Sequence, residues 1–240
     1  MSSKSVAPAR SLSGTIALTP DKSIAQRAAI FSLLHKGPST IYNYSQAKDP
    51  QTTLQCVQNL GAKVEIEADK ISIYGVGREG ISALTDELDC GNSGTAMRLL
   101  SGLLTGAGLS IKLIGDHSLS RRTMTRIISP LEKMGAHILA RNGVFAPLYI
   151  SRENPLKALE FTLPIPSAQL KSCILLAGLF GGEESCVIET IPSRDHTERL
   201  LQLRVETNAL GTRRIYSSKS DEIPAPVSYT HLTLPTIYSV

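Results

Sequence analysis

Two stretches of the sequence repeat each other: Asn59-Leu-Gly-Ala-Lys-Val-Glu-Ile-Glu67 and Lys133-Met-Gly-Ala-His-Ile-Leu-Ala-Arg141. In each stretch, a Gly-Ala pair follows an amphipathic run and precedes an alternating one. Glycine just past a helix can adopt the left-handed conformation that ends it, and alternation of apolar and polar residues is typical of a half-buried strand. Each stretch is therefore predicted to contain a helix end, a glycine stop and a strand.

The match continues upstream, where both copies open a helix. Ser23-Ile-Ala-Gln-Arg27 and Gly94-Thr-Ala-Met-Arg98 each place an arginine four residues after a small residue. We predict that Gly37-Pro38 ends the first of these helices and that the glycines at 106–108 end the second. Strands are expected to follow at Thr40–Tyr44 in the first copy and at the corresponding place, Leu109–Ile114, in the second.

A third copy begins at Ser167, with a helix to Leu179, a Gly181-Gly182 stop and a strand over 185–189. We interpret the chain as three units with the order strand–helix–strand–helix–strand–strand. Units of about 70 residues are too long for a simple solenoid. Because the helices are rich in alanine, serine and glycine, they can approach closely, and we expect them inside an α/β fold with the sheets outside.

The third copy weakens after Leu201, and residues 211–240 contain no convincing helix. Serine, threonine and proline are frequent there, which favours a flexible or foreign tail; an ordinary edge strand with turns is the alternative. The predicted organisation is an N-terminal segment (1–13), one domain (14–210) and this aberrant or flexible tail (211–240).

The composition excludes several classes of protein. Of 240 residues, 42% are hydrophobic and 19% are charged, and the net charge is +4, which fits neither a disordered chain nor a dedicated nucleic-acid binder. The longest useful apolar stretch, 173–180, is far shorter than the roughly 20 residues that span a bilayer, and residues 1–13 lack a secretory pattern. The cysteines show no metal-ligand spacing and are expected to be reduced, buried thiols in a cytoplasmic protein. They are Cys56, Cys90, Cys173 and Cys186.

Two helix starts carry residues that favour an anion. Lys22, Ser23 and Arg27 lie in the first turns of one helix, where unpaired N–H groups and the positive end of the helix dipole attract phosphate or carboxylate. The alternative is a helix cap with solvated charges. Gly94 lies at the equivalent position of the second copy, after Gly91-Asn-Ser, and leaves room for a ligand against the backbone.

Two further motifs offer partners for an anion. Arg121-Arg122, expected at a helix start with Arg126 one turn later, would clamp a second anion or form a solvated basic face. Ser167 and Gln169, at the third helix start, offer neutral hydrogen bonds to hydroxyls or phosphate oxygens.

The last motif lies at Ser193-Arg-Asp-His-Thr-Glu198. Ser193 is expected to cap a helix and Arg194 to face the same cleft. Asp195 and His196 invite a catalytic-dyad interpretation, but neighbours in sequence point in different directions on a helix. If the three copies surround a pseudo-threefold axis, all these helix starts converge on one anion-attracting face.

Taken together and in this order, the motifs resemble the 5-enolpyruvylshikimate-3-phosphate (EPSP) synthase family, the 3-phosphoshikimate 1-carboxyvinyltransferases. The resemblance implies transfer of the enolpyruvyl group of phosphoenolpyruvate to the 5-hydroxyl of shikimate 3-phosphate, with release of phosphate and without a metal or organic cofactor. It implies an inside-out α/β barrel of three βαβαββ repeats with pseudo-threefold symmetry. The motifs that carry it are Asp-Lys-Ser-Ile-x-x-Arg (21–27), Gly-Asn-Ser-Gly-Thr-Ala-Met-Arg (91–98), Arg-Arg (121–122), Ser-Ala-Gln (167–169) and Pro-Ser-Arg-Asp-His-Thr-Glu (192–198).

The resemblance also assigns roles to residues of this chain. The catalytic residues would be Lys22 and Arg122. Glyphosate would occupy the phosphoenolpyruvate site and meet Gly94. The residues implied for shikimate 3-phosphate are Lys22, Ser23, Arg27, Ser167, Ala168 (through its backbone), Gln169 and Arg194. Those implied for phosphoenolpyruvate are Lys22, Gly94, Arg122 and Gln169.

The chain departs from the family pattern in length and at two turns. Thr123 stands where proline commonly follows the arginine pair, and Thr19-Pro-Asp-Lys replaces a Gly-Ser/Asp-Lys turn. Because members of the family are much longer, we expect this chain to form the first domain, with impaired catalysis. Proton transfer requires an acid/base set, whereas Asp49, Asp89 and Asp195 are expected to be structural caps.

Three alternatives for the function stay open at this point. The chain is an impaired synthase, a non-catalytic domain that binds phosphorylated metabolites, or a structural fragment. Pairing of two copies into a homodimer would cover the face that borders the cleft. Neither a nucleic-acid partner nor a membrane partner is expected.

Overall fold

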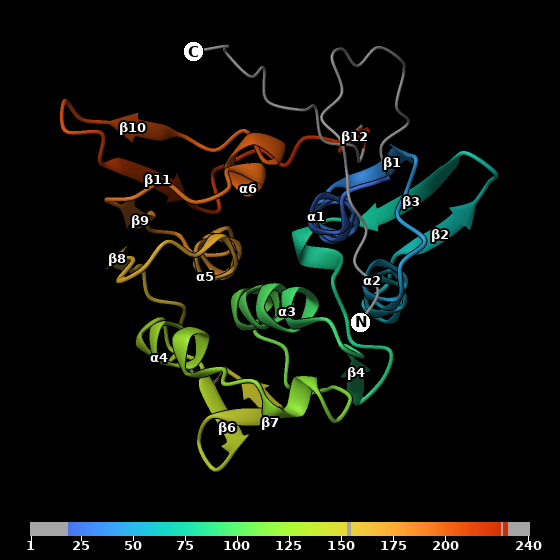
Figure 1. The fold of residues 1–240 in the computed structure, drawn as a ribbon, viewed down its shortest axis with the longest axis horizontal. Coiled ribbons are helices and arrows are strands. Elements are labelled where there is room, and N and C mark those ends of the chain that lie inside the picture. The colour runs from blue at the N-terminus through green and yellow to red at the C-terminus, as the bar shows by residue number, and fades with distance from the viewer. Residues whose placement is uncertain (1–18, 153–154, 227, 230–240) are drawn as a thin grey trace, which may run out of the picture.

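The computed structural model describes residues 19–152, 155–226 and 228–229, so the predicted N-terminal segment and the last part of the predicted tail lie outside the described residues. Three helices occupy the centre and are seen nearly end on in Figure 1: α1 (Lys22–Leu34), α3 (Gly94–Ala107) and α5 (Ala168–Gly178). The outer helices are α2 (Lys48–Asn59), α4 (Thr125–Lys133) and α6 (His196–Leu200), with 3-10 turns η1 (Arg78–Gly80) and η2 (Leu119–Arg121).

The strands form three four-stranded sheets around these helices (Figure 1). They are β1 (Lys36–Tyr42), β2 (Lys63–Ile66), β3 (Lys70–Val76), β4 (Glu87–Asp89), β5 (Ile111–Ile114), β6 (His137–Arg141), β7 (Phe145–Ser151), β8 (Glu160–Thr162), β9 (Ser185–Glu189), β10 (Val205–Thr207), β11 (Arg213–Ser217) and β12 (Ser228–Tyr229). The sheet orders are β12-β1-β3-β2, β4-β5-β7-β6 and β8-β9-β11-β10. In each sheet the first pair is parallel and the other two pairs are antiparallel.

The three sheets therefore repeat one topology, and the predicted α/β fold of three βαβαββ units is confirmed. The second and third units follow the chain in the expected order, β4-α3-β5-α4-β6-β7 and β8-α5-β9-α6-β10-β11. The first unit differs, because its first strand position is taken by β12, from the other end of the described chain. The sequence analysis did not predict that β12 completes the first sheet, because a strand of two residues is too short to show a periodic pattern.

The predicted tail begins too early. Strand β11 lies inside 211–240, yet it pairs with β9 on one side and β10 on the other, and Ile215 is fully buried. Its sequence, Arg-Arg-Ile-Tyr-Ser, is mostly polar, so the strand was hidden from a reading of hydrophobic pattern. Residues 213–217 thus continue the third sheet as an interior strand rather than as a flexible tail or an edge strand.

The first helix also ends earlier than predicted. Helix α1 stops at Leu34, and Gly37-Pro38 lie inside β1 instead of at the helix end. Three other glycine stops are observed: Gly61, Gly108 and Gly135 follow α2, α3 and α4 with φ of +106°, +71° and +105°. Such values favour glycine, because a side chain is strained in the left-handed region. The predicted Gly181-Gly182 stop is wrong, because α5 already ends at Gly178 and neither glycine is left-handed.

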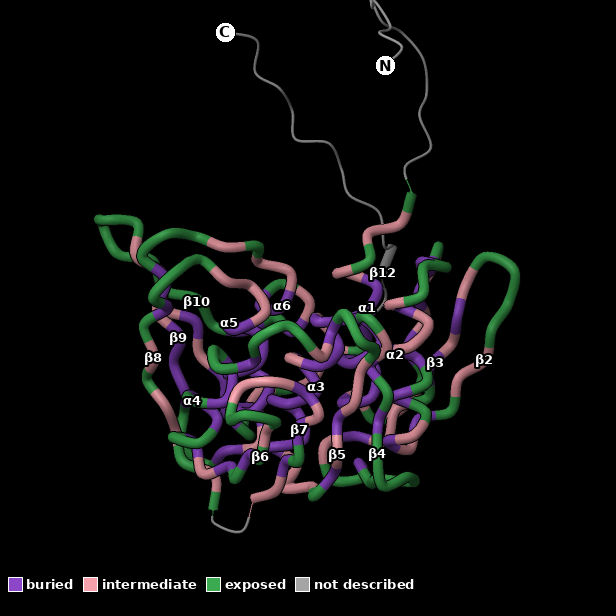
Figure 2. Tube along the Cα trace, turned by 60° about the horizontal axis from the view of Figure 1, so that its bottom comes forward, coloured by how far each residue is buried: buried purple, intermediate pink, exposed green. Residues whose placement is uncertain are grey.

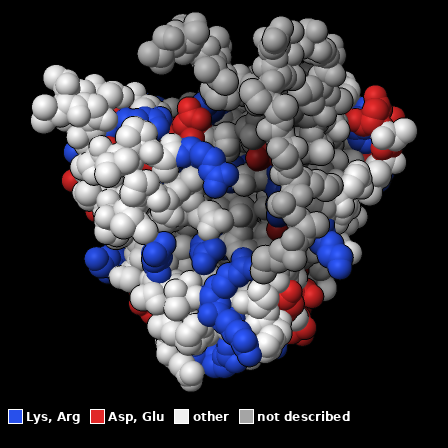
Figure 3. Space-filling view, viewed as in Figure 1, with Lys and Arg blue, Asp and Glu red and all other residues white. Residues whose placement is uncertain are grey.

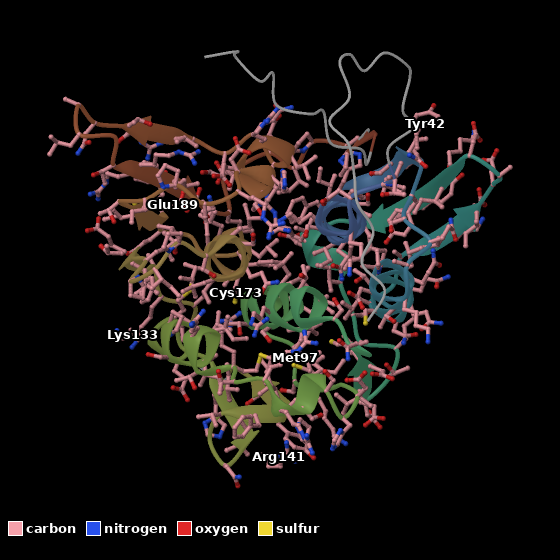
Figure 4. The ribbon with its side chains drawn as sticks, in the orientation of Figure 1. Tyr42, Met97, Lys133, Arg141, Cys173 and Glu189 are labelled. Atoms are coloured by element: carbon pink, nitrogen blue, oxygen red, sulfur yellow. The ribbon has the colours of Figure 1, made fainter. Side chains whose placement is uncertain are left out.

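The core is centred on the three inner helices. Figure 2 shows that buried positions concentrate on them, whereas the hairpin tips are exposed. Met97 and Cys173 lie among these helices, and Tyr42 and Arg141 lie on outer strands (Figure 4). The four cysteines are free and buried, as predicted. Among the described residues, no helix is both long and apolar enough to cross a membrane.

Helices α3 and α5 meet without side chains between their backbones. A Cβ atom on Gly102 would lie 2.1 Å from the carbonyl oxygen of Cys173. This separation is far below any van der Waals contact, so the contact of the two helices requires glycine at this position. The small residues that suggested close approach therefore act at a specific point of the helix interface.

We predict that Gly102→Ala destabilises the protein, because the added methyl group forces the two helix backbones apart. The free energy of unfolding, measured by urea denaturation, should fall by about 3 kcal/mol, the upper part of the range for an overpacked core. Gly182→Ala is the matched control, since a Cβ atom there would meet nothing within 4 Å. The control should stay within about 0.5 kcal/mol of the unchanged protein. Equal stability of the two variants would contradict the close contact.

Candidate functional site

The three inner helices begin at the same end of the molecule, and each has a side-chain cap. Asp21, Ser93 and Ser167 accept hydrogen bonds from backbone N–H groups three residues on, over 2.7, 3.0 and 3.3 Å. The remaining N–H groups of the first turns are free to face a ligand. The local sequence explains this, because each cap is a residue type that competes well for helix N–H groups.

Polar side chains join the three helix starts into a ring. Gln26 of α1 donates to the Ser93 hydroxyl at the start of α3 (2.5 Å). Arg98 of α3 donates to the side chain of Gln169 at the start of α5 (2.9 Å). Ser172 of α5 accepts from Arg27 of α1 (3.0 Å), which closes the ring. Each unit thus contacts the next, as the expected pseudo-threefold arrangement requires.

Arg27 ties α1 to the third unit. Its guanidinium donates to the Thr197 hydroxyl (2.9 Å) and to the carbonyl oxygens of Ala168 (3.3 Å) and Ser23 (3.2 Å), besides Ser172. The residue is only 2% exposed. Burial, followed by the nearby charge of Arg194, lowers the pKa of Arg27 to about 10. It still carries its charge at neutral pH, in a place where an anion would relieve the repulsion.

A pocket of about 450 Å³ opens beside Arg27, at the starts of α1 and α5. Arg194 lies across it from α1, with its guanidinium 3.5 Å from the Ser23 hydroxyl oxygen. The pocket is lined by Ser23, Arg27, Pro166, Ser167, Ala168, Gln169, Ser193 and Arg194. The structure therefore brings together every residue that the family resemblance implied for shikimate 3-phosphate except Lys22.

Lys22 lies next to this pocket without lining it. Its ammonium group pairs with Asp49 over 3.1 Å, and the side chain borders a larger hollow of about 810 Å³ with Tyr44 and Lys70. The pairing is between exposed groups, so it constrains Lys22 little.

A second group of arginines lies on the other side of Gln169. Arg98 is partly buried, and the neighbouring charges of Arg122 and Arg126 add to burial in lowering its pKa. Gln169 also donates to the Thr95 hydroxyl over 2.8 Å, which fixes its amide between the two arginine groups. The predicted phosphoenolpyruvate residues Gly94, Arg122 and Gln169 are therefore grouped around Arg98, which sequence reasoning did not assign to a site.

The Gly94 position is restricted on the protein side. A Cβ atom there would lie 2.6 Å from the Arg98 guanidinium and 3.4 Å from that of Arg122. Arg122 donates to the side chain of Asn92 over 2.6 Å. The expectation that Arg121 and Arg122 start a helix is wrong, because η2 ends at Arg121 and α4 begins only at Thr125. Lysine and arginine side chains are spread over the centre and lower part of the face shown in Figure 3.

Several other candidates have structural roles. The expectation that Ser193 caps a helix is wrong, because its hydroxyl donates to Glu189 and the residue before α6 is Asp195. Asp195 pairs with Arg199 over 3.9 Å in the following turn. Asp89 caps its own turn by accepting from the Gly91 N–H group over 2.7 Å. Asp89 is therefore held by its own turn, whereas the side chain of Asp195 is partly exposed and only loosely paired.

Sequence reasoning missed one charged group of the third unit. Lys171 and Glu189 are fully buried and paired over 2.9 Å, and Glu198 and Arg213 complete a cluster with them. A lysine at the inner face of an apolar helix was the available signal, since lysine is rarely buried without a partner. Within the described ranges, no group of three or more histidine, cysteine, aspartate or glutamate side chains could hold a metal ion.

The threefold α/β fold, with its arginine-lined pocket at the helix starts, defines a domain of the enolpyruvyl transferase type. The family model for EPSP synthase (3-phosphoshikimate 1-carboxyvinyltransferase) matches residues 6–215. The chain belongs to this family. The match passes beyond Leu201, where the third copy of the repeat weakens in the sequence, and reaches into β11.

Related proteins carry the same description. The chain is 47% identical over 224 residues to a 3-phosphoshikimate 1-carboxyvinyltransferase of Salinibacter ruber, covering 90% of this chain and 51% of the relative. One from Solibacter usitatus is 45% identical over 83% of this chain and 46% of its own length. The solved EPSP synthase of Acinetobacter baumannii is similar in fold, with a TM-score of 0.78 and 37% identity over 84% of this chain and 46% of that one. The chain spans about half the length of the curated relatives it matches.

We predict that His196 makes the stability of the protein depend on pH. Burial and the charge of Arg27 lower the pKa of His196 from its ordinary value of 6.5. The unfolded chain therefore takes up the proton more readily, and stability is lost as the pH falls below the unfolded value. The free energy of unfolding, measured between about pH 8 and pH 5, should fall more steeply for the unchanged protein than for His196→Asn. Parallel curves would show that His196 titrates as it does in the unfolded chain.

Proposed function

We propose that this chain forms the part of an EPSP synthase that holds shikimate 3-phosphate and phosphoenolpyruvate side by side. Shikimate 3-phosphate would occupy the 450 Å³ pocket between Ser23, Gln169 and Arg194. Phosphoenolpyruvate would bind at the adjoining group of Gly94 and Arg122. In the reaction of this family, the enolpyruvyl group then passes to the 5-hydroxyl and phosphate leaves.

One observation carries this proposal: two separate groups of arginines lie on either side of one amide. Arg27 and Arg194 repel each other at the pocket, and Arg98 and Arg122 repel each other beyond Gln169. In each group one arginine is removed from water at least in part: Arg27 is buried in the first group, and Arg98 is partly buried in the second. A cation held in this way binds an anion with little reorganisation, so each group favours its own anionic ligand. A reaction between two phosphorylated molecules needs such a pair of neighbouring anion sites.

The described residues are suited to binding and orientation rather than to proton transfer. Asp49, Asp89 and Asp195 all have structural partners. Lys22 and Arg122, which the resemblance names as catalytic, would stabilise negative charge as the phosphate leaves. We therefore propose that turnover by this chain alone is weak. Complementation of a strain that lacks the synthase tests the whole reaction, and growth at the normal rate would refute weak turnover.

A second candidate is a domain that binds phosphorylated metabolites without converting them. The structural partners of the three aspartates favour it over full activity. A coupled assay of phosphate release separates the two candidates. Sustained release from both substrates that is lost in Arg122→Ala favours the enzyme, whereas binding without release favours the binding domain.

Three narrower expectations stay proposals. Glyphosate would compete with phosphoenolpyruvate next to Gly94, which a competition titration would show. Two copies would pair through the face that carries the arginines, and sedimentation that finds only monomers would exclude this. The free, buried thiols fit a reducing compartment, so we place the protein in the cytoplasm, which fractionation of cells would test.

We predict that shikimate 3-phosphate shifts the backbone amide NMR signals of Ser23, Ala168 and Gln169, because the ligand sits on their helix starts. Gly143, at the tip of the β6–β7 hairpin, should not move. Arg194→Gln should weaken binding about tenfold, since a hydrogen bond to a charged group contributes roughly 1.5–3 kcal/mol.

Arg199→Gln is the matched control for Arg194→Gln. It removes the same charge from an exposed side chain outside the pocket, so it should leave the affinity nearly unchanged. No shift in any of the three amides at millimolar ligand, or equal affinities of the two variants, would refute the assignment of the pocket.

A further inference from the structure

Behind the pocket, four charged side chains form a closed group that the proposed chemistry does not use. The Lys171 ammonium donates to Glu189 over 2.9 Å and to Glu198 over 2.7 Å. Arg213 of β11 donates to the same two oxygens over 3.4 and 3.2 Å. The first three side chains are buried, and that of Arg213 is 18% exposed. We refer to these four residues as the Lys171 cluster.

The Lys171 cluster holds both ends of the segment that forms one wall of the pocket. Glu189 ends β9 and Glu198 lies in α6, and the pocket residues Ser193 and Arg194 lie between them. The second carboxylate oxygen of Glu189 accepts from the backbone N–H group of Ser193 over 3.2 Å and from its hydroxyl. The wall is therefore tied through Lys171 to α5, the start of which also lines the pocket.

The energetics point to geometry rather than to stability. One buried cation, one partly exposed cation and two buried anions cost solvation, and well-packed apolar residues usually stabilise a protein at least as well. One oxygen of Glu198 is buried without a hydrogen-bond partner among the described residues, which adds to the cost. Because its charges cancel, the cluster adds little net charge beside the pocket.

We propose that the Lys171 cluster positions the pocket wall: it fixes Ser193 and Arg194 at the distance from α1 that a phosphorylated ligand requires. Its four members are positioning residues, since Arg194 and Ser193 stand between them and the ligand. The identity of the ligand rests on the proposed function, whereas the positioning of the wall concerns the free protein as well.

Glu189→Gln separates positioning from electrostatics by the sign of its effect. The substitution keeps the size of the side chain and removes one negative charge close to an anion site. If the cluster acted only through charge, the variant would bind a phosphorylated ligand more tightly. If the cluster holds the wall, the variant binds more weakly, because Lys171 is left with an unbalanced charge and Ser193 with a weaker acceptor.

The experiment measures hydrogen exchange of the Ser193 amide in the free chain and the affinity for shikimate 3-phosphate. For Glu189→Gln we expect exchange to be faster by about tenfold and binding to be weaker by about tenfold. Glu184→Gln is the matched control, because it removes the same charge from an exposed pair with Arg204. Unchanged exchange at Ser193, or tighter binding, would overturn the proposal.

Two further variants keep the test decisive. Leu113→Ala lowers the stability of the protein at a buried position of the second sheet. It should leave unchanged both the exchange rate of the Ser193 amide and the affinity for shikimate 3-phosphate. If Glu189→Gln does not fold, Arg213→Gln is used instead, because Arg213 lies at the exposed edge of the Lys171 cluster. We expect the Ser193 amide to exchange faster in Arg213→Gln than in the unchanged chain. An unchanged exchange rate would overturn the proposal. If the unchanged chain binds no shikimate 3-phosphate, the proposed function fails, while the exchange measurement still decides on positioning.

Discussion

Positive charge concentrated at one end of a helix bundle is the constraint on which the rest of the structure depends. Three helices direct the positive ends of their dipoles to the same face, and two groups of arginines lie among them. Each of these elements repels the others, so the arrangement persists only because packing and hydrogen bonds hold it. The ring of Gln26, Arg98 and Ser172 supplies those bonds within the first turns.

The close packing of the helices below the ring is what brings the three helix starts together. The helix starts lie close enough to share a ligand only if the helices themselves approach closely, and Gly102 against the Cys173 backbone allows this. The sheets then lie outside and cover the remaining apolar faces of the helices. The folded chain therefore contains a repulsion between cations at this face, and an anion bound there, as in the proposed function, would offset it.

The third unit illustrates how a fold can position a side chain that lies on a loop rather than on a helix. Arg194 comes from a connection between β9 and α6, where backbone bonds alone define its place poorly. The adjoining Glu189 and Glu198 are paired with Lys171 in the depth of the domain. Such a buried pairing costs solvation, and in the proposed role that cost would be offset by the defined position of the pocket wall.

The sequence by itself determined the repeat, the α/β class and the starts of the three inner helices, because caps, glycine stops and periodicity are local and leave a trace in neighbouring residues. The residues around the pocket were indicated by the motifs that the chain shares with its family. The tertiary structure alone decided what depends on distant partners. It placed β12 in the first sheet, drew the polar β11 into the third, paired Lys22 with Asp49 and buried Lys171. The physical reason is that the energy of each such contact depends on two residues that lie far apart in the sequence. The pattern around one of them carries no information about which residue is its partner.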